Sequence, residues 1–380
     1  MSDYNDANIV MFPSGRKASK LYSQKPLDAS ADFTVVRGTV ANEINSNGLV
    51  SEVADNVPRL DYDNTATCPS LLLELSRENE QTASSNFNNG FWSKVAGSTV
   101  TINSITAPDG TLTGNKITRG SNDLILRTSS LTIIPSGLFY TYSVYAKEGN
   151  ITSMSLDIKD EGEVNFTLTD EWQRIEISVT PSADGFVDIS FPSSSAGEYV
   201  YLWGGQLEAG GFASTLITTT TTAVTRALDK VSKSGISSIL NDTEGVLFAE
   251  IQALNVNSDD SPVSISSGLD YNNRILFYTS ASNYIYVFCF SGGVNSFSFG
   301  INTVNVLNFN KIALKYKSGD YAFWINGVEV ATGTGVDTPI GLDVLAFDQG
   351  FGGGYFNGRC KSLQYYNTIL TDTELATLTT

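Results

Sequence analysis

Paired carboxylates are the groups in this sequence that could carry out hydrolytic chemistry. A glycoside hydrolase needs two of them about 5 to 10 Å apart across a cleft. Glu161 and Glu163 lie two positions apart, but their DEGE segment is typical of an exposed turn. The E-x-D-x-x-E strand of some sandwich-fold glycosidases does not occur. We therefore expect no catalytic residues and no enzymatic activity, with a polysaccharide depolymerase as the alternative.

The sequence contains no histidine, which excludes Ser-His-Asp and Cys-His nucleophilic mechanisms and histidine-ligated zinc. Its three cysteines, Cys68, Cys289 and Cys360, form no CxxC motif. An odd number of cysteines cannot all pair with one another, so we expect reduced and buried thiols. We expect no cofactor.

Oxygen-bearing side chains gather once in a pattern that could attract calcium: Asp259, Asp260, Asp270, Asn272 and Asn273. Their spacing fits no EF-hand, so we expect a solvated loop and no metal site. The glycine-rich run GFGGG at 350–354 lacks the Lys-Ser/Thr ending of a phosphate-binding loop. It predicts a loop at a sheet corner.

Sugar binding would use an exposed aromatic ring beside amide or carboxylate groups. The four tryptophans, Trp92, Trp172, Trp203 and Trp324, all lie in or beside strand-like patterns. Core packing is therefore the favoured role for each of them. Trp92 and Trp324 are kept as candidates for glycan contact.

The overall charge restricts the partners of this chain. There are 23 Lys and Arg residues against 40 Asp and Glu residues, a net charge of −17. A surface of this sign repels polyanions, so we expect no nucleic-acid partner. No apolar run approaches the roughly 18 residues of a membrane span. The acidic start MSDYNDANIVMF differs from a signal peptide, so we expect a protein made in a cytoplasm and released by lysis.

The first 30 residues differ in charge from the rest of the chain. Between Arg16 and Lys25 there are four basic side chains and no acidic one. This run predicts docking onto an acidic partner, and a solvated basic segment is the alternative. The candidate docking residues are Phe12, Arg16, Lys17, Lys20 and Lys25.

Short alternating segments separated by turn signals dominate the rest of the chain. This pattern is typical of antiparallel sandwiches and jelly rolls. We expect an all-β protein with two antiparallel β-sandwich domains after a mostly irregular N-terminal module. The expected boundaries are 1–85 for that module, 86–217 for the first sandwich, 218–243 for a connector and 244–380 for the second sandwich. Expected strands in the first sandwich are 133–146, 154–158, 164–168, 172–179, 186–191 and 198–207.

The second sandwich carries its own local patterns. In 284–290, aromatic residues alternate with Ile285, Val287 and Cys289, which predicts a strand covered on both faces. YAFWINGVEV at 321–330 predicts a hairpin that turns at Asn-Gly. Thr371 followed three positions later by Glu374 predicts a capping box at the start of a final helix.

Several of these segments resemble tail-fibre and head-fibre proteins of tailed phages. The resemblance covers KLYS at 20–23, DFT at 32–34, Arg37-Gly38, NGL at 47–49, PRLDY at 58–62, CPSLLLE at 68–74, WGGQLE at 203–208 and TRALD at 225–229. Glu43 departs from it, because the family usually has Arg there. The segments FWSK at 91–94, TYSVYAK at 141–147 and WQR at 172–174 resemble the family's carbohydrate-binding-module-like jelly roll. Residues from about 244 onward resemble a laminin-G-like, concanavalin-A-like sandwich.

The resemblance implies a structural fibre or decoration protein of a phage virion, with a head fibre favoured over a tail fibre. It implies docking to other virion proteins through residues 1–30, a homotrimer, and two displayed sandwiches that could contact host surface glycans. A bacterial surface adhesin is a second alternative. If residues 1–30 serve only for docking, their deletion should leave a folded protein that no longer enters particles.

Overall fold

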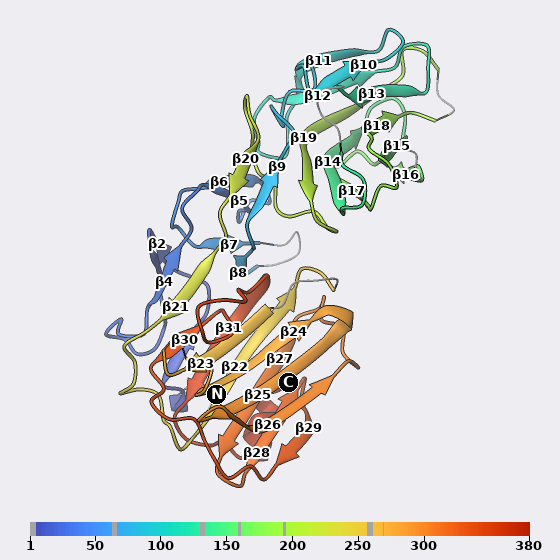
Figure 1. Ribbon diagram of the computed structural model, residues 1–380. Coiled ribbons are helices and arrows are strands. Elements are labelled where there is room, and N and C mark those ends of the chain that lie inside the picture. The colour runs from blue at the N-terminus through green and yellow to red at the C-terminus, as the bar shows by residue number, and fades with distance from the viewer. Residues whose placement is uncertain are drawn as a thin grey trace. The chain divides into compact units, whose positions relative to one another are not determined.

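The computed structural model describes residues 5–62, 67–129, 134–158, 161–192, 195–256, 261–268 and 270–380. Its internal contacts divide the chain into two compact units (Figure 1). Unit 1 contains Met1–Val40, Val53–Leu75 and Ala227–Thr380. Unit 2 contains Ala41–Glu52 and Ser76–Arg226.

Unit 1 contains two large antiparallel sheets. The first, sheet A, has seven strands in one path, and β1 also pairs with β31. In spatial order the path is β29 (Val328–Gly333), β28 (Tyr321–Ile325), β27 (Asn310–Lys317), β22 (Glu244–Ala253), β31 (Gly358–Tyr366), β8 (Ser70–Leu73) and β7 (Arg59–Asp61), with β1 at Ile9–Met11.

The second sheet of unit 1, sheet B, has nine strands. In spatial order they are β2 (Arg16–Lys17), β3 (Lys20–Leu21), β4 (Phe33–Val36), β21 (Lys230–Lys233), β30 (Val344–Ala346), β23 (Ser261–Ser266), β24 (Arg274–Ser280), β25 (Tyr284–Ser291) and β26 (Val294–Ile301). A short 3-10 helix, η1 (Ala281–Asn283), joins β24 to β25.

The two sheets of unit 1 pack face to face around one core (Figure 1). Leu247 and Leu363 of sheet A are fully buried in it together with Phe277 and Val287 of sheet B. The opposite face of sheet A holds a smaller cluster that includes Phe248. Successive side chains of β22 point to opposite faces of the sheet, and apolar residues occupy both. This strand is therefore buried on both of its faces.

The helix α2 (Asp372–Thr379) covers that second face of sheet A with Leu375 and Leu378. Its capping box is present as expected, with Thr371 as N-cap and Glu374 at N3. The expected hairpin is also confirmed as β28 and β29, where Asn326 and Gly327 have φ values of 49° and 82°. Positive φ at both turn positions suits an Asn-Gly pair.

The N-terminal segment is built into unit 1. One side of β31 pairs with β22, and its other side pairs with β8 and, further along, with β1. Without these two short strands, that side of β31 would present unpaired N–H and C=O groups. The structure therefore differs from the expected separate and mostly irregular module over 1–85: Met1–Val40 and Val53–Leu75 belong to unit 1 and contribute strands to its sheets, and the rest belongs to unit 2.

The expected connector at 218–243 also contains ordered strands. β20 (Val224–Arg226) pairs with β9 (Arg77–Asn79) in unit 2, and β21 joins sheet B between β4 and β30 in unit 1. The threonine run before β20 carries no apolar period, so the sequence pattern gave no indication of these pairings.

Unit 2 is a second antiparallel sandwich, built from two five-stranded sheets. One has the order β10 (Trp92–Lys94), β13 (Leu124–Thr128), β18 (Val187–Ser190), β15 (Ser153–Ile158) and β16 (Val164–Thr167). The other has the order β11 (Thr99–Ile105), β12 (Gly114–Thr118), β19 (Tyr199–Ala209), β14 (Tyr140–Glu148) and β17 (Gln173–Val179). A further pair is formed by β5 (Ala41–Ile44) and β6 (Val50–Val53).

The core of unit 2 lies between its two large sheets and includes Tyr142, Leu156, Ile189 and Leu202, all fully buried. The strands expected at 154–158, 164–168, 172–179, 186–191 and 198–207 are confirmed within one or two residues at each end. The expected strand at 133–146 begins later, at Tyr140, and its position 133 lies outside the described residues. The all-β fold class is confirmed.

Among the described residues, no helix combines the length and apolar composition that a membrane crossing requires.

Candidate functional site

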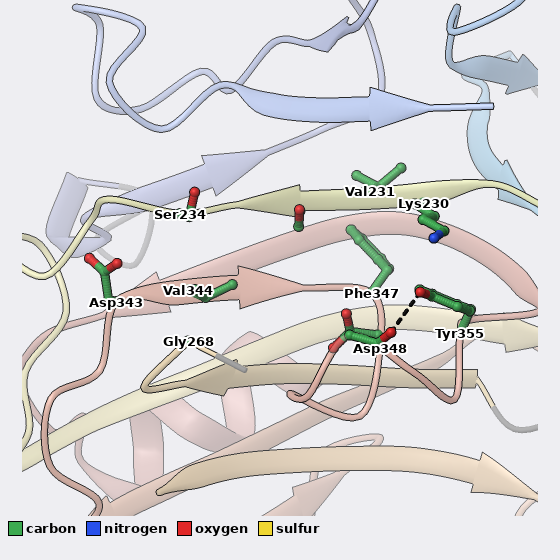
Figure 2. Close-up of a pocket in the computed structure, with 11 residues that line it drawn as sticks. Lys230, Val231, Ser234, Gly268, Asp343, Val344, Phe347, Asp348 and Tyr355 are labelled. Carbon is green, nitrogen blue, oxygen red and sulfur yellow. Dashed lines mark hydrogen bonds between the residues drawn. The ribbon is translucent and has the colours of Figure 1, made fainter. Parts of the chain in front are cut away.

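A pocket of about 450 Å³ opens in unit 1 beside β21 and β30 (Figure 2). These two strands are neighbours because Ser232 pairs with Ala346 across the sheet. The wall of the pocket is more apolar than polar, with Val231, Val344 and Phe347 among its lining residues. Pockets that bind small ligands typically have volumes of about 300 to 1,000 Å³, so this one has the size of a binding site.

One end of the pocket holds an aromatic ring and a cation. The ammonium group of Lys230 lies 4.8 Å from the centroid of the Tyr355 ring, within cation–π distance. The phenol of Tyr355 donates a 2.6 Å hydrogen bond to the carbonyl of Gly352 (Figure 2). The two contacts fix the position of the ring at the pocket wall.

Asp348 contributes a half-buried carboxylate to the same end of the pocket. Burial raises the pKa of its carboxyl group, while hydrogen bonds from the backbone and the charges of Arg274 and Lys230 act in the opposite direction. Its Oδ1 accepts a 2.6 Å hydrogen bond from the backbone N–H of Gly350. A partly desolvated carboxylate of this kind is a strong acceptor for ligand hydroxyl groups.

The other end of the pocket contains Asp343 and Ser234 (Figure 2). The carboxylate of Asp343 accepts hydrogen bonds from the backbone N–H groups of Gly235 (3.3 Å) and Ser237 (3.0 Å). These bonds hold the turn after β21 against the segment that leads into β30. Asp343 therefore shapes this end of the pocket and adds a second negative charge.

The glycine-rich loop between β30 and β31 forms one side of the pocket. Gly350, Gly352 and Gly354 adopt φ values of 85°, 74° and 61°, a region that favours glycine. Phe351 of this loop stacks on Tyr271, with ring centroids 4.1 Å apart. The run forms a loop between strands, as the sequence predicts.

Arg274 of β24 holds this loop against sheet B. Its guanidinium donates to the carbonyl of Gln349 and lies 4.8 Å from the ring of Tyr271, 5.5 Å from that of Phe351 and 5.1 Å from that of Phe290. Arg274 thus acts through the loop, as a positioning residue for the pocket wall.

A row of aromatic side chains lies along β25 on the face of sheet B that points away from the core. Successive ring centroids of Tyr284, Tyr286, Phe288 and Phe290 are 5.2, 6.2 and 5.9 Å apart, and the rings are nearly parallel. The sequence pattern predicts that the side chains on both faces of this strand are buried. Only those on the core side, Ile285, Val287 and Cys289, are buried. On the other face the rings are half-exposed and cover one another.

The tryptophans proposed for glycan contact are buried. Trp92 is 3% exposed and stacks on Phe87, and Trp324 is 7% exposed in the cluster beneath α2. Trp203 is buried as well, whereas Trp172 is half-buried. Since a sugar needs an accessible ring face, the burial of Trp92 and Trp324 removes both as glycan platforms.

The basic docking candidates make contacts within unit 1. Arg16 donates a 2.6 Å hydrogen bond to the carbonyl of Pro58, and Lys25 donates to the carbonyls of Asn5 (2.7 Å) and Ala7 (3.1 Å). The run between them is therefore integrated into the folded unit.

The remaining docking candidates stay accessible. Phe12 is 37% exposed, and Lys17 is exposed on β2. Lys20 is exposed, and its ammonium group lies 3.7 Å from the carboxylate of the buried Asp32. These three side chains are the part of the predicted docking segment that a partner could reach.

The acidic residues considered for catalysis or metal binding have other partners. Glu161 accepts hydrogen bonds from the backbone and hydroxyl of Ser182, and Glu163 accepts one from Ser155. Asp270 accepts a 2.9 Å hydrogen bond from the N–H of Asn272 within a tight turn. Asp259 and Asp260 lie outside the described residues. In the described part of the chain no three His, Cys, Asp or Glu side chains form a group that could hold a metal.

No sequence pattern identifies the pocket residues. Lys230, Asp348 and Tyr355 lie up to 125 positions apart and form no recognisable motif. The one local indication is the glycine-rich run beside them, whose pattern predicts a loop and no binding role.

Searches against protein-family models and against curated proteins find no match. Among solved structures, the carbohydrate-binding module CBM40 of the Ruminococcus gnavus IT-sialidase, bound to α2,3-sialyllactose, is similar at 19% identity and a TM-score of 0.34. That match covers 38% of this chain and 86% of the module.

Two other solved structures show likeness of the same order. The NanB sialidase of Streptococcus pneumoniae matches at 19% identity and a TM-score of 0.33, over 38% of this chain and 26% of the sialidase. Domain 4 of AbnA, a GH43 arabinanase from Geobacillus stearothermophilus in complex with arabinotriose, matches at 16% identity and a TM-score of 0.32, over 40% of this chain and 73% of the domain. At TM-scores this low, the likeness identifies neither a ligand nor an activity for this chain.

Proposed function

We propose that this chain is a non-catalytic structural and adhesive protein of a phage particle, which contacts host surface glycans through the pocket of unit 1. The observation that supports glycan contact is the composition of that pocket. It combines the Tyr355 ring, the half-buried carboxylate of Asp348 and the ammonium of Lys230 with a largely apolar wall. Sugars offer apolar C–H faces and hydroxyl edges, and both find partners among these groups.

The placement in a phage particle rests on the sequence resemblance, with a head fibre favoured over a tail fibre. The accessible side chains of Phe12, Lys17 and Lys20 would form the docking surface toward an acidic virion protein. A homotrimer is proposed on the same resemblance. Clustered copies would raise the avidity of weak glycan contacts by about a hundredfold or more.

Glycan contact is tested by presenting the full chain to an array of host capsule and cell-wall oligosaccharides. We expect retention of at least one class of sugar by the wild type, and loss of that retention in Asp348→Asn and Lys230→Met. Absence of binding to every sugar on the array would refute this part of the proposal.

The non-catalytic assignment is tested by incubating the chain with the same polysaccharides and measuring new reducing ends. We expect none above the buffer control. New ends that depend on a carboxylate of this chain would establish the depolymerase alternative.

The virion assignment is tested by mass spectrometry of purified particles and by analytical ultracentrifugation of the isolated chain. We expect peptides of this chain in the particles and a sedimenting species of three copies. Its presence on the bacterial surface and absence from particles would establish the adhesin alternative.

A further inference from the structure

We propose that the pocket of unit 1 selects uncharged, hydroxyl-rich sugars and rejects their acidic counterparts, with Asp348 as the residue that makes this distinction. This inference rests on the proposed glycan-binding function and specifies the ligand of the same site. It follows from the charges that line the pocket, from their partners and from its size.

The charged groups of the pocket do not favour an anion. Lys230 contributes one positive charge, and Asp343 and Asp348 contribute two negative charges, so the lining carries 1 − 2 = −1. The chain as a whole carries −17. A sugar carboxylate that entered this pocket would meet like charge nearby and a repulsive field at longer range.

Lys230 does not offset this repulsion, because its charge already has partners. Its ammonium lies over the Tyr355 ring, and its positive charge acts on the Asp348 carboxylate. A ligand carboxylate that paired with Lys230 would have to draw the ammonium group away from the Tyr355 ring. The ligand carboxylate would also share the pocket with the half-buried carboxylate of Asp348, and like charges at short range oppose binding.

The same groups suit a neutral sugar. A carboxylate accepts hydrogen bonds from hydroxyl groups, and an ammonium group donates to hydroxyl oxygens. Ser232 and Ser234 add hydroxyl groups to the pocket lining, and the half-buried Val344 adds apolar surface for C–H groups. The volume of about 450 Å³ lies toward the lower end of the range for ligand pockets. We therefore expect a short ligand, such as the terminal residues of a glycan chain.

Matched sugar pairs test this selectivity. We would titrate the full chain by calorimetry with glucose and glucuronate, galactose and galacturonate, and lactose and 3′-sialyllactose. In the first two pairs a carboxylate replaces the CH2OH group, and in the third the acidic member carries an additional terminal sialic acid. We expect the neutral member of the bound pair to bind at least about tenfold more tightly, because the acidic member replaces a hydroxyl hydrogen bond to the Asp348 carboxylate with a like-charge contact.

Two variants connect the selectivity to the pocket. Asp348→Asn keeps the shape of the side chain and an acceptor for the Gly350 N–H, but removes the charge. We expect this variant to weaken the binding of neutral sugars about tenfold and to bring the ratio of neutral to acidic affinities close to one. Lys230→Met keeps the length of the side chain and should also weaken neutral binding. Glu244→Gln, in a half-exposed pair with Lys317 outside the pocket lining, is the control and should leave both affinities unchanged.

The outcomes separate this inference from the function on which it rests. Tighter binding of the acidic members, lost in Asp348→Asn or Lys230→Met, would overturn the selectivity and leave glycan binding by the pocket in place. Sugar binding that neither variant changes would overturn the assignment to this pocket. Absence of binding in all three pairs, together with an empty glycan array, would overturn the proposed function and this inference with it.

Discussion

A buried ion pair joins Arg37 to Asp229, two residues that are 192 positions apart in the sequence. Arg37 Nη1 lies 3.0 Å from Asp229 Oδ1, and the two side chains are 0% and 1% exposed. Asp229 also pairs with Arg59, which in turn pairs with Glu74. Desolvation alone would lower the pKa of Arg59, but the charges of Asp229 and Glu74 raise it above its ordinary value.

Backbone groups complete this network. Arg37 donates to the carbonyls of Thr39 (2.9 Å), Ala54 (2.6 Å) and Val57 (3.0 Å), and the N–H of Glu74 donates to Asp229 (3.0 Å). Each carboxylate and guanidinium therefore meets several partners, as buried charges require. The network ties together three separate stretches of chain within unit 1.

The first prediction concerns this network. Asp229→Asn keeps the side-chain shape but leaves the buried guanidinium groups of Arg37 and Arg59 without one of their counter-charges. We expect unit 1 to lose about 3 to 5 kcal/mol of unfolding free energy, the usual cost of breaking a buried pair from one side. Urea titration measures this loss of unfolding free energy, and hydrogen exchange in peptides of β22 and β31 reports the unfolding of unit 1.

The control for this prediction is Glu244→Gln, which breaks a half-exposed pair with Lys317 in the same unit. Pairs of this kind contribute about 0 to 1 kcal/mol. A loss in Asp229→Asn no larger than that of the control would contradict the role assigned to the network.

The second prediction corrects the expected result of removing residues 1–30. Ile9, Val10, Met11 and Leu21 are fully buried in the clusters of unit 1, and β1 pairs with β31. Deletion removes these strands and exposes core surface, so we expect a destabilised or insoluble unit 1 instead of a folded protein. Met11→Ala alone should cost about 2 to 5 kcal/mol.

Point variants separate docking from folding. Lys17→Ala changes an exposed side chain and should leave the melting temperature within about 1 °C, since surface substitutions typically change stability by less than about 0.5 kcal/mol. If this variant folds and fails to enter particles, docking is affected directly. A deletion of 1–30 that melts like the wild type would show that β1 is dispensable.

The third prediction concerns the thiols, and it corrects the expectation that all three are buried. Cys68 is exposed, whereas Cys289 and Cys360 are buried. Burial raises the pKa of Cys289 to about 12 and raises that of Cys360 as well. At pH 8 we expect one thiol per native chain to react with Ellman's reagent and three to react in denaturant.

Cys68→Ser should abolish the native reaction and leave two thiols in denaturant. A second fast-reacting thiol in the native wild type would mean that one of the two buried sites opens on the time scale of the assay.

The fourth prediction concerns the stability of unit 2 as a function of pH. Glu208 is fully buried, and desolvation raises the pKa of its carboxyl group despite hydrogen bonds from Gln206 and Ser214. The native state therefore holds this proton at a pH where the unfolded chain has lost it. The contribution of Glu208 to stability is largest below its unfolded pKa of about 4.5 and declines as pH rises through the folded pKa.

Glu208→Gln removes this titration and keeps an acceptor for Gln206 Nε2 and the Ser214 N–H, which lie 2.7 and 2.8 Å from Oε1. We expect the unfolding free energy of the variant, relative to that of the wild type, to increase as the pH rises from 4.5 to 7. Urea unfolding, monitored by hydrogen exchange in β19, measures this free energy at pH 4.5 and at pH 7. A difference that does not change with pH would contradict the raised pKa.

Local sequence patterns predicted much of the secondary structure. The Asn326-Gly327 hairpin, the Thr371 capping box and the strands of unit 2 are confirmed because turn, cap and alternation signals depend on residues close together in the chain. Burial was harder to predict. Trp92 and Trp324 are aromatic residues of the kind that bind sugars, but residues distant in the sequence pack around both and bury them.

The sequence by itself determined the all-β class, the presence of two sandwiches and an acidic chain without histidine chemistry, because these follow from composition and short-range periodicity. Tertiary structure alone decided that residues 9–11 and 71–73 complete the sheet beside β31, that Arg37 meets Asp229, and that Lys230, Asp348 and Tyr355 share a pocket. Strand pairing and charge pairing between distant segments depend on the register of whole sheets, and no local pattern records that register.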